Sequence, residues 1–168
     1  AAYFGNTAHK EGDMVSFVCE DFTDEDEWKQ DDKEAVIFTL VAESGLLQGT
    51  GRKGTGRKKV IKRGQELIAN TDRCGSCHPY RDNETELGYA PDLNGWGSEE
   101  WLVGIITDPT HQRFYPDTND RMPRFGVASE GGLQALSNKQ IKLVSQWLRG
   151  SWYRPAVHNQ ANSDRDHL

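Results

Sequence analysis

The five residues Cys74-Gly75-Ser76-Cys77-His78 constrain this chain more than any other feature of its sequence. Two thiols three positions apart, followed directly by an imidazole, match the two vinyl groups and the iron of one haem. Each cysteine can form a thioether, and the histidine then lies where a ring nitrogen can take an axial position on the iron. The motif therefore predicts one covalent haem c, attached through Cys74 and Cys77, with His78 as a metal ligand.

The same spacing of thiols is open to two other interpretations. A thioredoxin-like redox pair normally accompanies a βαβ pattern, and no strand-like run precedes Cys74. A zinc site would need a second pair of ligands at similar spacing, and the one other cysteine of the chain, Cys19, lies far upstream. Haem attachment is therefore the leading interpretation, and a non-haem zinc or thiol-redox protein is the weaker alternative. Cys19 itself is expected to be buried or simply unpaired.

A haem that only transfers electrons needs a second axial ligand, and Met122 is the candidate. It precedes Pro123 in a polar loop 44 positions after His78, which is far enough for the loop to reach the opposite face of the haem. A thioether ligand favours ferrous iron and raises the reduction potential. His111 is the alternative ligand. Met14 could bind iron only if a second haem, attached to a segment outside this sequence, reached it.

Several further residues are candidates for contact with the haem or its histidine. Pro91 follows His78 by thirteen positions in an extended Ala-Pro step, and its backbone carbonyl could accept a hydrogen bond from the second ring nitrogen. Aromatic side chains downstream are candidate walls of the pocket, and two of them, Trp96 and Tyr115, could also bond a propionate. The candidate walls are Trp96, Trp101, Tyr115 and Phe125.

Three stretches of this part of the chain have helical spacing. Residues 60–70 lead directly into the motif, and Gly64 among them predicts close contact with another helix. Ser98 predicts the start of a second helix with acidic residues in its first turn. Ser137 opens a capping box that begins a last helix, and Gly150 ends that helix.

The chain divides into four parts. Residues 59–153 contain the motif and the three helices and form the predicted main domain. A glycine-rich basic linker, 49–58, precedes it, and a polar tail, 154–168, follows it. Residues 1–48 resemble a degenerate half-repeat of the main domain, because an acidic stretch leads there to an apolar helix that also ends at a glycine, Gly45.

Charge is unevenly placed along the chain. The net charge of −6 argues against nucleic acid as a partner, since binding to phosphates needs a basic surface. Residues 20–34 contain nine acidic side chains, whereas residues 52–63 contain seven basic ones and no acidic one. These stretches are either two solvated surfaces or a means of steering a redox partner electrostatically.

No stretch of the sequence is long and apolar enough to span a membrane. The longest apolar run covers residues 35–42. The chain starts with Ala1-Ala2 rather than methionine, which indicates a processed or truncated product. Thioether attachment of haem implies maturation outside the cytoplasm, so we expect a periplasmic or equivalent compartment. Only 35% of the residues are hydrophobic, and a buried porphyrin would supply missing apolar volume.

Three short sequence segments and the terminal helix together resemble a class I cytochrome c over residues 59–153. The segments are Cys74 to His78, Ala90-Pro91-Asp92-Leu93 and Arg121-Met122-Pro123. The resemblance implies an all-α fold in which the first and last helices of the domain cross. The residues expected at this crossing are Gly64 and Ile68 on one helix, and Leu143 and Trp147 on the other.

Two longer phrases, residues 95–102 and 3–10, resemble c-type haem domains attached to bacterial cytochrome bc complexes. By this resemblance Met14 matches an axial-ligand position of a preceding haem domain whose own attachment motif is absent here. The chain is then the downstream part of a longer di-haem protein. The partners implied are redox proteins, among them the cytochrome b and Rieske subunits of a membrane complex, and the missing upstream half of a di-haem domain.

The sequence therefore predicts an electron carrier rather than an enzyme. No nucleophile and base accompany the motif, and an iron with two axial ligands has no position for a substrate. The alternative is a haem enzyme or gas sensor in which Met122 does not bind and the iron is open.

Overall fold

Residues 8–46, 55–83, 85–119, 121–128 and 135–151 are described in a computed structural model of the chain. Within these residues the regular structure is helical, without strands, which confirms the predicted all-α class. The elements are η1 (Ala8–Glu11), α1 (Asp13–Cys19), α2 (Gln30–Glu43), α3 (Thr55–Ala69), η2 (Cys74–Ser76), α4 (Glu99–Thr107) and α5 (Asn138–Leu148). The predicted tail, 154–168, and residues 3–7 and 49–54 lie outside the described part.

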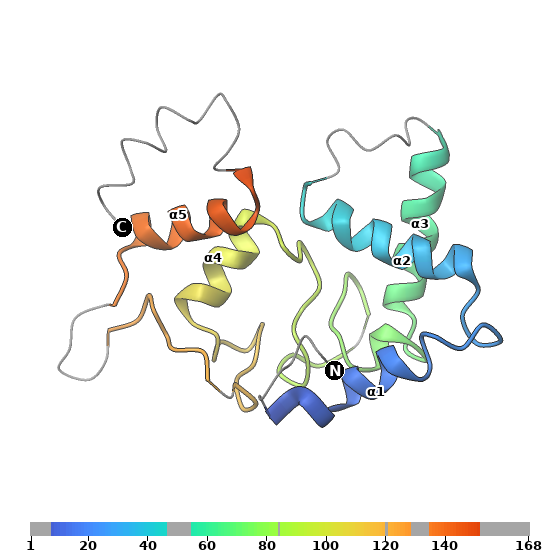
Figure 1. Ribbon diagram of the computed structural model, residues 1–168, viewed down its shortest axis with the longest axis horizontal. Helices are drawn as coiled ribbons and strands as arrows, with labels where there is room; N and C mark the ends of the chain where they lie inside the picture. Colours follow the sequence, from blue (N-terminus) through green and yellow to red (C-terminus); the bar gives the residue numbers. More distant parts are fainter. Residues whose placement is uncertain (1–7, 47–54, 84, 120, 129–134, 152–168) are drawn as a thin grey trace.

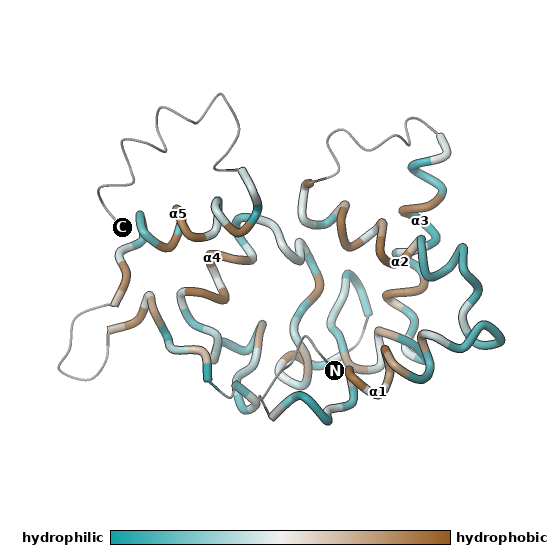
Figure 2. Tube along the Cα trace, in the orientation of Figure 1, coloured by the Kyte–Doolittle hydropathy of each residue, from teal (hydrophilic) through white to brown (hydrophobic). Residues whose placement is uncertain are grey.

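The helices form two pairs that lie side by side (Figure 1). Helices α2 and α3 form one pair, and α4 and α5 form the other. The segment between η2 and α4 runs between the pairs, and α1 lies below it in the view of Figure 1. Figure 2 shows the connection from α1 to α2 as hydrophilic, in agreement with the acidic stretch predicted there. No helix in the described ranges has the length and apolar character needed to cross a membrane.

Gly64 lies at a close contact between α2 and α3. A Cβ atom at this position would overlap the carbonyl oxygen of Ala35 and Oγ1 of Thr39. Thr39 is buried, and its hydroxyl donates to the backbone carbonyl of Ile61 at 3.2 Å. The predicted close helix contact of Gly64 is confirmed. Its predicted partner is wrong, because the neighbouring helix is α2 and not the last helix.

The last helix, α5, packs against α4 instead of crossing α3. The Ser145 hydroxyl donates to the Glu99 carbonyl at 3.2 Å, and Leu143 is buried. Trp147, expected at a crossing with Gly64, is 56% exposed. The physical reason is steric, since α2 already occupies the face of α3 around Gly64.

The ends of the helices follow from local chemistry. Ser98 caps α4 by accepting from the Trp101 backbone N–H, and Ser137 forms both bonds of the predicted capping box with Gln140. Gly150 follows α5 with φ of 65°, a conformation that favours glycine. These predictions are confirmed. Helix α3 begins at Thr55, so that residues 55–58 of the predicted linker are helical.

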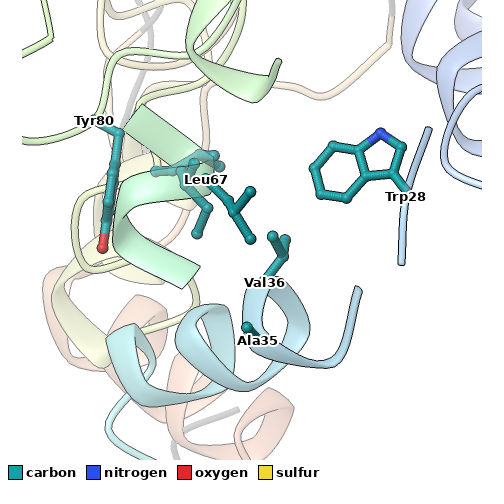
Figure 3. Close-up of a cluster of buried hydrophobic side chains, with 7 residues drawn as sticks. Trp28, Ala35, Val36, Leu67 and Tyr80 are labelled. Carbon is teal, nitrogen blue, oxygen red and sulfur yellow. The ribbon is translucent and has the colours of Figure 1, made fainter. Parts of the chain in front are cut away.

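One core joins the residues before and after the predicted linker. Figure 3 shows Tyr80 on one side of Leu67 and Trp28 on the other, with Val36 of α2 below them. Burial and the hydrogen bond to Glu43 raise the pKa of Tyr80 to about 12, so its hydroxyl stays protonated well above neutral pH. The complete cluster is Trp28, Ala35, Val36, Leu67, Ile68, Tyr80 and Leu93.

Candidate functional site

The Cys-x-x-Cys-His motif forms a tight turn, which residues 70–73 connect to the end of α3. The His78 backbone N–H donates to the Cys74 carbonyl at 2.9 Å, and the Cys77 N–H donates to the same carbonyl at 3.3 Å. Gly75 is required here, because a Cβ would lie 2.6 Å from the Ala69 carbonyl oxygen. The turn therefore packs onto the last turn of α3 and brings both thiols and the imidazole within five consecutive residues.

The two thiols of the turn are not joined in a disulfide. Cys74 and Cys77 are both half-buried and unpaired. Burial raises the pKa of the Cys74 thiol, whereas a reactive redox cysteine needs a lowered pKa to form a thiolate at neutral pH. Cys74 is thus not suited to be the attacking thiol of a redox pair at neutral pH, and the turn presents two unpaired thiols.

The ring of His78 is oriented by Pro91. The distance from Nδ1 of His78 to the carbonyl oxygen of Pro91 is 2.8 Å, which is the hydrogen bond expected from the sequence. A carbonyl can only accept, so Nδ1 must carry the proton and Nε2 keeps its lone pair. Burial lowers the pKa of His78. The imidazole is thereby kept neutral, with Nε2 as the nitrogen that can bind a metal.

A second layer of bonds fixes the loop that carries Pro91. The Trp101 indole N–H donates to the Asp92 carbonyl at 2.8 Å, and the Asp92 N–H donates to the Arg113 carbonyl at 2.9 Å. The Arg113 side chain also forms an ion pair with Asp92, in which Nε of Arg113 lies 2.9 Å from Oδ2 of Asp92. The Leu93 N–H donates to the Pro79 carbonyl at 3.0 Å. These bonds to Asp92 and Leu93, the two residues after Pro91, therefore hold Pro91 beside His78.

Sequence reasoning did not identify Asp92 or Arg113 as site residues. Asp92 belongs to the segment Ala90-Pro91-Asp92-Leu93. Its ion pair with Arg113 joins positions 21 apart, and no local sequence pattern reveals such a pair. Trp101 was predicted as a pocket wall. Its indole also supports the carbonyl next to Pro91, and its ring packs on Phe114 at 5.2 Å between centroids.

The other predicted aromatic residues of the pocket are Trp96, Tyr115 and Phe125. Trp96 lies near Trp101, with 6.3 Å between ring centroids. Tyr115 is half-buried, and burial raises its pKa. Phe125 is half-buried as well, and its carbonyl accepts from the Leu136 N–H at 2.9 Å.

Met122 is half-buried, and its carbonyl accepts from the Asn119 amide at 2.9 Å. This contact does not test the side chain as an iron ligand, and Met122 stays a predicted ligand.

The alternative ligands have other surroundings. Nδ1 of His111 accepts from the Arg113 backbone N–H at 3.2 Å, and the residue is exposed. Met14, on α1, is 47% exposed. Its neighbour Asp13 accepts from the Tyr89 hydroxyl at 2.8 Å, which ties α1 to the loop before Pro91. Cys19 is unpaired and exposed.

Among the described residues, no three His, Cys, Asp or Glu side chains come together in a way that could hold a metal ion. A haem does not need such a group, because the porphyrin supplies four nitrogens and the protein supplies only the axial ligands.

Comparisons of the chain with protein-family models, with curated proteins and with solved structures find no match.

Proposed function

We propose that this protein is an electron-transfer c-type cytochrome with one covalent haem and a class I cytochrome c fold. Cys74 and Cys77 would form the thioethers, Nε2 of His78 would be one axial ligand, and Met122 would be the other. The observation that carries the proposal is the hydrogen bond from His78 Nδ1 to the Pro91 carbonyl. It selects the tautomer whose Nε2 can bind iron, and the histidine in question directly follows two unpaired thiols.

The residues present fit such a group. Cys74 and Cys77 are unpaired, the imidazole is kept neutral by burial, and its donating nitrogen is already hydrogen-bonded. The haem would supply a one-electron exchange between ferric and ferrous iron. The chain's own residues orient the ligand: the Pro91 carbonyl raises the basicity of the imidazole, and Trp101 and Arg113 bond to Asp92, the residue that follows Pro91.

The setting of this activity is also proposed. Residues 95–102 resemble haem domains of bacterial cytochrome bc complexes, which supports a quinol-oxidising complex as the electron source and a downstream acceptor. This interpretation implies the cytochrome b and Rieske subunits as partners. The haem domain would lie in the periplasm or an equivalent compartment. The upstream half of a di-haem domain would be a further partner, with Met14 as its iron ligand.

The first test is the mass and colour of the protein, produced in a host that matures c-type cytochromes. We expect a red protein whose intact mass exceeds that of the polypeptide by one haem. A colourless product with the bare polypeptide mass would refute the proposal, and a zinc or thiol protein would become the better reading.

The second test addresses the axial methionine. Met122→Ala should keep the attached haem, lower its reduction potential and open the iron to carbon monoxide or cyanide. Met14→Ala is the matched control and should change none of these, because the haem that Met14 would bind is attached to a segment outside this sequence. The wild type should show the weak long-wavelength absorption of ferric iron bound to a thioether. If it lacks this band and binds carbon monoxide rapidly, the iron is open and the protein is a haem enzyme or sensor.

A further inference from the structure

Glu43, the last residue of α2, contacts both loops that form the histidine site. Its Oε1 accepts from the Tyr80 hydroxyl at 2.6 Å and from Nη2 of Arg81 at 3.2 Å. Its Oε2 accepts from the Gly95 backbone N–H at 3.0 Å. The side chain is 18% exposed, so these bonds are partly shielded from water.

The two oxygens of Glu43 serve different loops. Tyr80 and Arg81 follow His78 closely in sequence, whereas Gly95 lies four positions after Pro91. One carboxylate therefore bridges the loop that carries the imidazole and the loop that carries its acceptor. Charge-assisted bonds of this kind are shorter and stronger than neutral ones.

The end of α2 is itself held in place, and this fixes the backbone from which the Glu43 side chain extends. The carbonyl of Ser44, the residue after Glu43, accepts from Nη2 of Arg149 at 2.8 Å. Gly45 then leaves the helix with φ of 74°, which favours glycine. The C-terminal ends of α2 and α5 thus meet beside the loop that Glu43 holds.

We propose that Glu43 is a positioning residue for His78, which fixes the imidazole by holding its loop and the Pro91 loop in register. Its effect on iron rests on the proposed haem function, whereas its effect on the loops does not. Glu43 lies 35 positions before the histidine. It belongs to residues 1–48, which were predicted to be a separate half-repeat.

The geometry makes glutamine an informative replacement. A glutamine side chain has one acceptor oxygen and one donor nitrogen. Because both oxygens of Glu43 accept, Glu43→Gln cannot keep all three bonds. With its oxygen toward Gly95, the amide nitrogen faces the Arg81 guanidinium, donor against donor, and meets Tyr80 only if that hydroxyl turns to accept. With its nitrogen toward Gly95, the bond to the Gly95 N–H is lost.

The matched control is Asp32→Asn, on the same helix. Asp32 forms an ion pair with Arg63 of α3 at 2.7 Å, and it contacts neither loop. Amide hydrogen exchange at Gly95 and Leu93 reports the register of the loops without any haem, since Leu93 donates to the Pro79 carbonyl. We expect exchange at both amides to be about tenfold faster in Glu43→Gln than in Asp32→Asn.

In the haem-loaded protein, Glu43→Gln should also shift the reduction potential and speed exchange of the His78 Nδ1 proton, whereas Asp32→Asn should leave both as in the wild type. Equal changes in the two variants would mean a general loss of stability and would overturn the proposal, as would no change in Glu43→Gln. If that variant does not fold, Tyr80→Phe removes one donor to Glu43 and should give a smaller change in the same direction. A wild type without haem would end the proposed function, yet the Gly95 and Leu93 measurement would still decide whether Glu43 holds the loops.

Discussion

At position 64 a single hydrogen atom in place of a methyl group decides how closely two helices approach. The backbone of α3 comes so near to Ala35 and Thr39 that no other side chain fits between them. Glycine is costly inside a helix, by about 1 kcal/mol relative to alanine. Its presence here means that the packing of α2 on α3 contributes more than this cost.

Gly64→Ala should consequently destabilise the protein although alanine is the better helix former. Overpacking at such a contact costs about 1–3 kcal/mol. Gly56, in the first turn of the same helix, is the matched control, because nothing lies within 4 Å of a Cβ there. Gly56→Ala should be neutral or stabilise by up to about 1 kcal/mol. Urea unfolding measures both, and equal free energies of unfolding for the two variants would contradict the close approach.

Residues governed by local rules were predictable from the sequence. The Cys-x-x-Cys-His turn, the caps at Ser98 and Ser137 and the acceptor at Pro91 each follow from the chemistry of a few neighbouring positions. Glu43 was not predictable, because its bond to Gly95 joins positions 52 apart. A side chain that acts only through tertiary contacts leaves no pattern in a single sequence.

At the level of the elements, helical periodicity predicted the helices but not their partners. An apolar stripe shows which face of a helix is buried and not which other helix covers it. The stripe of α3 around Gly64 was expected to face the last helix, and it faces α2 instead. The small side chains of Ala35 and Thr39 let α2 pack against α3 at Gly64. The ion pair between Arg63 and Asp32 is a second contact between the same two helices.

The ion pair makes the contact between α2 and α3 sensitive to acid. Hydrogen bonding from Arg63 lowers the pKa of Asp32, so its stabilising contribution is complete above the ordinary carboxyl pKa and is lost as the pH falls through the lowered value. The pair is partly exposed, and its expected worth is about 0.5–1 kcal/mol. Asp32→Asn should therefore be less stable than the wild type by this amount at neutral pH. In urea unfolding from about pH 7 to about pH 2, the difference should shrink toward zero at the acid end, and a difference independent of pH would contradict the assignment.

Over the whole molecule, one core unites segments that the sequence separates by a basic linker. Trp28 is 3% exposed and lies edge-on to Phe17 and Phe22, with ring centroids 5.9 and 4.9 Å away. The guanidinium of Arg73 stacks over the same indole at 4.2 Å. Because Arg73 directly precedes Cys74, this indole supports the residue from which the turn begins, although it lies 46 positions upstream of Cys74.

Trp28→Ala should therefore loosen the attachment turn as well as α2. Removal of a buried tryptophan costs about 3–5 kcal/mol, and amide exchange should rise together in α2, in α3 and in the turn around Cys74. Trp147→Ala is the control, because this indole is 56% exposed and its loss should cost less than about 1 kcal/mol. If Trp28→Ala instead raised exchange in α2 alone, residues 8–46 would unfold independently, and the core in Figure 3 would not act as one cooperative unit.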